Sequence, residues 1–104
     1  MEITNEDKHE LENLLDIATN QIPRYFNLVN SNKENWQIKD INECILGMVF
    51  EKYIHDSGQY LSNKEIDDNS PNSIENSMKA YNLGIEVFGD NIANIKRQIQ
   101  QSYS

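Results

Sequence analysis

The C-terminal part of the chain carries an unbroken series of apolar residues at alternating steps of four and three. The series consists of Ile74, Met78, Tyr81, Ile85, Phe88, Ile92, Ile95 and Ile99. Side chains at this spacing share one face of an α-helix, which has about 3.6 residues per turn. The series predicts either one helix of roughly 30 residues or two collinear pieces that meet near Gly89-Asp90. The register continues across Gly84 and Gly89, which favours one helix.

The N-terminal part of the chain carries a second apolar stripe. Its members are Leu11, Leu15, Ala18, Ile22, Tyr25 and Val29. Thr4 and Asp7 have the spacing of a capping box, which marks a helix start. Pro23 lacks a backbone donor and clashes with the preceding turn, so it disturbs a helix that contains it. Because the stripe stays in register past Pro23, we expect a kink or a break with restart, and no change of direction.

A third apolar face lies between these two. It is formed by Ile38, Ile41, Ile45, Met48 and Val49 and is widened by Leu46, Phe50 and Tyr53. Ser31 and Glu34 have capping-box spacing, so we expect a central helix from about Lys33 to His55. Gly47 is unfavourable inside a helix and is interpreted as permitting a close helix crossing.

The central helix is expected to end at Asp56-Ser57-Gly58, with Gly58 as a left-handed cap. Residues 59–69 then form a connection, with a short turn near Ser62–Ile66. Ser70 followed by Pro71 is the pattern of an N-cap and a first helical residue, so the C-terminal helix is expected to begin there.

Together these patterns predict an all-α fold, an antiparallel helical bundle of three long helices plus a short helix or turn in the 59–69 connection. A chain of 104 residues has the size of one domain, so residues 1–104 are expected to form a single helical domain. No apolar stretch reaches the roughly 20 residues needed to cross a bilayer, and the acidic, polar N-terminus does not resemble a signal peptide. We therefore expect a cytoplasmic protein without membrane contact.

Acidic residues outnumber basic ones and concentrate in two segments. The net charge is −8; residues 1–16 carry six acids and one lysine, and residues 51–75 carry six acids and two lysines. A phosphate backbone repels such a surface, so direct nucleic-acid binding is not expected. A basic protein is the natural partner for two acidic patches, because opposite fields steer their encounter. The alternative is that the charge only keeps the domain soluble.

Residue types that carry catalysis or hold metals are sparse. Cys44 is the only cysteine and lies in an apolar run, so it is interpreted as a core residue. Two acid–histidine pairs have metal-ligand spacing, Glu6 with His9 and Glu51 with His55. A di-iron bundle needs further inward glutamates, which the pattern lacks. With no glycine-rich phosphate loop and no Ser–His–Asp arrangement, we expect no enzyme activity, no cofactor and no metal.

A cluster of acidic and aromatic residues lies in the predicted 59–69 connection. Its members are Tyr60, Glu65, Asp67 and Asp68. The predicted fold does not require these residue types there, and tyrosine is enriched at interface hot spots. We therefore interpret the cluster as a candidate partner-binding site.

Part of the chain, about residues 50–81, resembles the colicin and pyocin DNase immunity proteins. The likeness runs through Phe50-Glu51, His55-Asp56-Ser57-Gly58 and Asp67-Asp68-Asn69-Ser70-Pro71, and then through Ile74, Met78, Lys79 and Tyr81. Members of that family are small acidic four-helix proteins that bind and neutralise a nuclease toxin. The resemblance implies inhibition by tight binding, with a binding surface at Glu51, Asp56 and Tyr60.

The sequence supports two functional hypotheses. The first is a protein-binding inhibitor, immunity-like or anti-defence, that neutralises a basic partner such as a nuclease toxin or a defence nuclease. Its partner-binding residues would be Glu51, Asp56, Tyr60, Glu65, Asp67 and Asp68. The second is a homodimeric structural or regulatory module that associates through the Ile74–Ile99 seam, because a regular seam suits a coiled-coil-like contact. The dimer seam would be formed by Ile85, Phe88, Ile92, Ile95 and Ile99.

Overall fold

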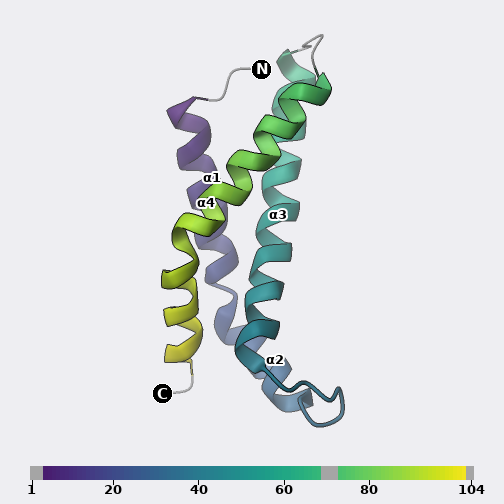
Figure 1. Cartoon of the computed structure of the whole chain (residues 1–104), viewed down its shortest axis with the longest axis vertical. Coiled ribbons are helices and arrows are strands. Elements are labelled where there is room, and N and C mark those ends of the chain that lie inside the picture. The colour runs from purple at the N-terminus through teal and green to yellow at the C-terminus, as the bar shows by residue number, and fades with distance from the viewer. Residues whose placement is uncertain (1–3, 69–72, 103–104) are drawn as a thin grey trace.

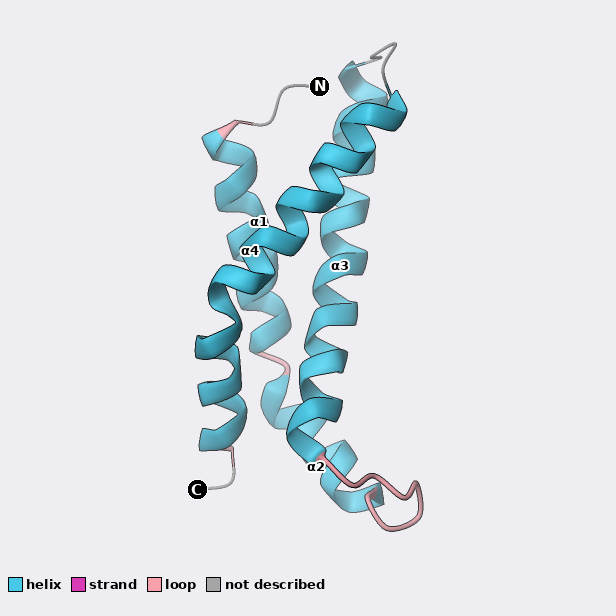
Figure 2. Ribbon diagram, viewed as in Figure 1, coloured by secondary structure: helices cyan, strands magenta, loops and turns pink. Residues whose placement is uncertain are grey.

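The computed structural model describes residues 4–68 and 73–102, and in these ranges the chain consists of helices joined by short turns, without strands (Figure 2). The elements are α1 (Asn5–Thr19), α2 (Ile22–Asn32), α3 (Ile41–Asp68) and α4 (Ser73–Gln101). Figure 1 shows α1 running down the bundle, α3 running up it and α4 running down again. The predicted all-α bundle is confirmed for the described residues, with α1 and α2 following one another as one bent helix.

The start of α1 and the break after it follow the local sequence. The Thr4 hydroxyl accepts a hydrogen bond from the Asp7 amide at 3.2 Å, and the Asp7 carboxylate accepts one from the Thr4 amide at 2.9 Å. The predicted capping box is therefore confirmed. α1 ends at Thr19 and α2 restarts at Ile22 with Pro23 in its first turn, where a missing backbone donor has no effect. The predicted break with restart is confirmed, whereas the expectation of no change of direction is wrong, because α2 bends away from the line of α1 (Figure 1).

α3 begins later than the sequence pattern predicts. Ser31 lies inside α2, so the predicted start near Lys33 is wrong. Residues 33–40 form a turn in which Gln37 has a φ of 55°, a left-handed conformation that interrupts any helix. The residue that caps the start of α3 is Asp40, whose carboxylate accepts a hydrogen bond from the Glu43 amide at 3.1 Å.

α3 also ends later than predicted, because it continues through Gly58 to Asp68. Gly58 is therefore not a left-handed cap, and residues 59–68 are helix, not a connection with a short helix or turn. A glycine inside a helix costs about 1 kcal/mol, whereas burying a leucine side chain contributes about 2 kcal/mol. Continuing the helix leaves Leu61 only 6% exposed and brings Tyr60 against α1, so the longer helix is favoured.

The core of α3 advances in steps of four residues. Its buried members are Ile45, Val49, Tyr53, Ser57 and Leu61. A row at this spacing rotates by about 40° per step around the helix axis, so α3 crosses its neighbours obliquely. The Tyr53 ring stacks on Phe88 with ring centroids 6.0 Å apart, and its hydroxyl donates to the Gly84 carbonyl oxygen at 2.7 Å.

The close crossing of α3 and α4 lies at Gly84. A Cβ atom placed there would come within 3.7 Å of the Tyr53 hydroxyl and of the Ser57 hydroxyl. The same atom placed at Gly47 would meet nothing within 4 Å, so the interpretation of Gly47 as a crossing point is wrong. α4 runs without interruption through Gly84 and Gly89, which confirms one continuous helix. The predicted cap at Ser70-Pro71 lies outside the described residues.

Candidate partner-binding surface

The antiparallel packing of α1 and α3 brings two acidic parts of the chain together. Residues 4–16 carry five acids and one lysine, and residues 51–68 carry five acids and two lysines. Both stretches lie in the upper part of the bundle in Figure 1, near the N-terminus and the α3–α4 turn. We call residues 4–16 and 51–68 the acidic end. Segments far apart in the sequence thus form one region of negative charge.

The opposite part of the bundle carries a different charge. It consists of α2, the 33–40 turn, the start of α3 and the C-terminal half of α4 (Figure 1). Its basic residues are Arg24, Arg97, Lys33, Lys39 and Lys96, and its acids are Glu34, Asp40, Glu43 and Asp90, so it lacks the excess of negative charge of the acidic end. The sequence showed where charge concentrates along the chain, and the topology separates it between the two ends of the molecule.

A buried carboxylate joins α1 to α3 within the acidic end. Asp7 is 2% exposed, and one of its oxygens accepts a hydrogen bond from the Tyr60 hydroxyl at 2.9 Å. Its other oxygen accepts from the Thr4 amide at 2.9 Å and the Thr4 hydroxyl at 3.1 Å. A buried charge needs such partners to offset its lost hydration. Tyr60, interpreted above as a hot-spot residue, has its hydroxyl committed to this internal link.

Sequence reasoning treated Asp7 only as a capping residue and missed its tertiary role. The signal was present, because Asp7 lies four residues before Leu11 and eight before Leu15. It therefore occupies the next position of the apolar stripe towards the N-terminus, on the buried face of the helix. An acid on such a stripe predicts a hydrogen-bonding partner from another element.

The pKa of Tyr60 is affected by the negative charges of the acidic end. The pKa of Tyr60 is raised from 10.0 to about 12, first by burial and then by the hydrogen bond to Asp7 and the negative charges of Asp7, Glu10 and Glu6. A neighbouring negative charge disfavours a phenolate because like charges repel. The acids of α1 therefore act directly on a side chain of α3.

The two tyrosines with raised pKa values predict a loss of stability in alkali. Burial also raises the pKa of Tyr53 to about 12, from an ordinary value of 10.0. Above about pH 10 the unfolded chain ionises these phenols more readily than the folded chain does, so protons are released on unfolding. The stability that the phenols contribute is fully present below pH 10 and is lost as the pH rises towards 12. Urea unfolding at about pH 9 and about pH 11 measures the loss.

The matched control for this pH dependence is the double variant Tyr53→Phe, Tyr60→Phe. It is less stable than the parent chain at neutral pH, but its stability should fall less between about pH 9 and about pH 11, because it lacks the two phenols. An equal fall in both proteins would contradict the assignment.

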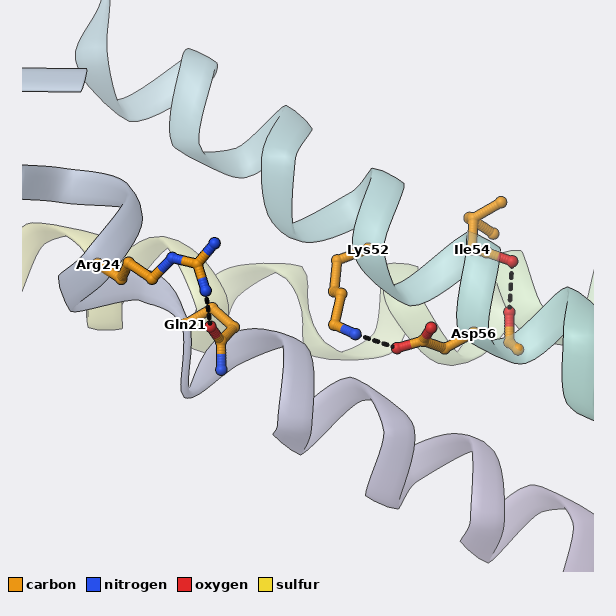
Figure 3. Close-up of polar contacts among 6 residues, drawn as sticks. Gln21, Arg24, Lys52, Ile54 and Asp56 are labelled. Atoms are coloured by element: carbon orange, nitrogen blue, oxygen red, sulfur yellow. Dashed lines mark hydrogen bonds and ion pairs between the residues drawn. The ribbon is translucent and has the colours of Figure 1, made fainter. Parts of the chain in front are cut away.

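The other predicted partner-binding residues differ in their surroundings. Glu51 is exposed on α3, and Asp56 forms an ion pair with Lys52 at 2.7 Å (Figure 3). The hydrogen bond and charge of Asp56 raise the pKa of Lys52. The last turns of α3 contain Glu65, Asp67 and Asp68, whose side chains lie outside the described part of the structure. Because the backbone of these three residues is helical, the acids belong to the end of a helix and not to a loop.

A groove of about 530 Å³ lies between α2 and α3. It is lined by Tyr25, Cys44, Gly47, Met48, Glu51, Lys52 and His55. Cys44 is partly buried, so its sulfur borders the core and the groove. Over the ranges 4–68 and 73–102, no group of three or more His, Cys, Asp and Glu side chains could hold a metal ion.

The Ile74–Ile99 seam has two parts with different surroundings. Phe88, Ile95 and Ile99 are at most 7% exposed and belong to the core of the chain itself, and Ile92 is partly buried against it. A homodimer through these residues would have to open that core. Towards the N-terminus of α4, the described seam residues Met78, Tyr81 and Ile85 are exposed.

None of the helices, over the residues described, has the length and apolar character required to cross a membrane. Comparisons of the chain with protein-family models, with curated proteins and with solved structures find no match.

Proposed function

We propose that this chain is a cytoplasmic inhibitor that binds a basic partner protein through its acidic end and acts by occupying the partner, without catalysis. The observation that carries the proposal is the antiparallel packing of α1 and α3, which joins two acidic segments into one region (Figure 1). The contact between the two segments supports it, because the Tyr60 hydroxyl of α3 donates a hydrogen bond to the Asp7 carboxylate of α1 at 2.9 Å. A concentrated field of one sign steers an oppositely charged protein and raises its association rate.

The resemblance of residues 50–81 to DNase immunity proteins supports a nuclease as the class of basic partner. A nuclease binds a polyanion and therefore presents a positive surface, which a region of carboxylates can cover. Two of the residues to which the resemblance assigns binding, Glu51 and Asp56, lie on α3 within the acidic end. We therefore propose a nuclease toxin or a defence nuclease as the partner.

The test is photo-cross-linking in the source cells, followed by binding measurements on the recovered protein. We expect the cross-linked protein to carry net positive charge and its complex to dissociate as salt rises from about 50 mM to about 300 mM. The variant Glu6→Lys, Glu10→Lys should weaken binding by about tenfold or more, mainly through slower association.

The control is Glu34→Lys, Glu43→Lys, which changes the net charge equally but lies at the other end of the bundle. It should weaken binding much less, because exposed charges farther apart than about 10 Å are largely screened. Equal effects of the two variants would show that net charge alone matters, and a neutral or acidic partner would contradict the proposal.

A further inference from the structure

The N-terminal half of α4 presents an apolar strip to solvent. Its three members are Met78, Tyr81 and Ile85, which are 63%, 56% and 39% exposed. They occupy positions i, i+3 and i+7, so they lie on one face of the helix. We call these three residues the apolar strip. In a chain with a net charge of −8 and a mean hydropathy of −0.73, three exposed apolar side chains on one face of a helix require an explanation.

The apolar strip does not contribute to the core that the rest of the seam forms. Among the described side chains of α4, those that belong to the core or pack against it begin at Leu83 and continue through Val87 and Phe88 to Ile99, and the apolar strip is not among them. Polar residues at positions 78, 81 and 85 would therefore leave this core unchanged. Folding alone does not explain why apolar side chains extend the seam beyond it.

The apolar strip lies in the same part of the bundle as the acidic end. α4 begins beside the end of α3, so its first half lies in the same upper part of the bundle as residues 4–16 and 51–68 (Figure 1). Ile85 and Lys96 are separated by three helical turns and share one side of α4. Lys96 lines a small cavity together with Asp40, which caps α3, and Glu43 in the first turn of α3, so this side of α4 faces the start of α3.

We propose that the apolar strip is the desolvated centre of the partner-binding surface, and that its occupant is the basic protein and not a second copy of this chain. The inference rests on the function proposed above. Interfaces typically combine an apolar or aromatic centre with a polar rim, and an aromatic residue at the centre contributes most of the binding energy. Tyr81 between Met78 and Ile85 provides such a centre, and the acidic end provides the rim.

The charge of the acidic end favours a basic partner protein over a second copy of this chain as the occupant of the apolar strip. A symmetric dimer places the same surface of both copies in contact, so a dimer through the strip would bring two acidic ends together. Like charges at such an interface are unfavourable and suppress association. A basic partner meets the same apolar surface with charges of the opposite sign.

The test uses a library of random peptides displayed on phage, selected at low salt against the whole chain. The strip variant is Met78→Ser, Tyr81→Ser, Ile85→Ser, and the control is Leu28→Ser, a leucine 45% exposed on α2 at the other end. We expect the enriched peptides to combine Lys or Arg with an aromatic or aliphatic residue. They should bind the strip variant about tenfold more weakly and the control unchanged. Circular dichroism checks that all three proteins are helical.

The other outcomes overturn the inference and separate it from the proposed function. Peptides that contain basic residues alone and bind the strip variant equally well would leave the acidic end as the site and remove the strip from it. Apolar peptides without basic residues, or no enriched peptides, would count against both proposals. Sedimentation equilibrium that shows a dimer in the parent chain and a monomer in the strip variant would identify a second copy as the occupant.

Discussion

The variant Tyr53→Ala is expected to lose about 4 kcal/mol of unfolding free energy, because it removes a large aromatic side chain from a closed core. Tyr53 is 0% exposed and is the largest of the fully buried side chains described. Its ring stacks on Phe88, and its hydroxyl donates to the Gly84 carbonyl oxygen where α3 and α4 cross. Truncation therefore leaves a cavity at the contact that fixes these two helices. Urea unfolding followed by circular dichroism measures the loss.

Two further tyrosine variants distinguish the contribution of the buried ring to stability from that of the hydroxyl. Tyr81→Ala removes the same side chain from a position 56% exposed on α4, and it should change the unfolding free energy by less than about 0.5 kcal/mol. Tyr53→Phe keeps the ring and removes only the hydroxyl, so the expected loss is about 1 to 1.5 kcal/mol. Similar losses for Tyr53→Ala and Tyr81→Ala would show that the α3–α4 core is not as described.

The second large effect is expected for Asp7→Ala, with a loss of about 3 kcal/mol from the cap and from hydrogen bonds to a charged group. This substitution removes the acceptor for the Thr4 amide and hydroxyl and leaves the Tyr60 hydroxyl without its partner on α1. The link between α1 and the end of α3 would be lost. Residues 59–68 should then exchange their amide hydrogens faster than the rest of α3, because less tertiary contact holds them.

The neighbouring acid provides the control for Asp7. Glu6 lies in the same first turn and interacts similarly with the helix dipole, but it is exposed, so Glu6→Ala should cost less than about 0.5 kcal/mol. A double-mutant cycle of Asp7→Ala with Tyr60→Phe should give a coupling energy of about 1 to 2 kcal/mol. A coupling near zero, or equal costs for Asp7→Ala and Glu6→Ala, would contradict the proposed link.

The candidate surface could be predicted only in part. Its charge is visible in the composition of residues 1–16 and 51–75, and a basic partner follows from that charge. The sequence pattern placed Tyr60 on a connection, whereas the structure places it on α3 with its hydroxyl bound to Asp7. The exposed start of the seam was not predictable either, because Tyr81 and Phe88 are equivalent in the repeat, yet Tyr81 is exposed and Phe88 is buried.

The local sequence pattern was sufficient to predict the helical class, the break at Pro23, the capping box of Thr4 and Asp7 and the continuity of α4. These features depend on residues within one or two turns of each other, so periodicity and local hydrogen bonding are sufficient to predict them. Three features became visible only in the folded chain: α3 continues past Gly58, Asp7 and Tyr60 form a hydrogen bond, and the two acidic segments lie at one end of the bundle. Each of these depends on contacts between distant residues, and the burial of Leu61 outweighs the local preference of a glycine to end the helix.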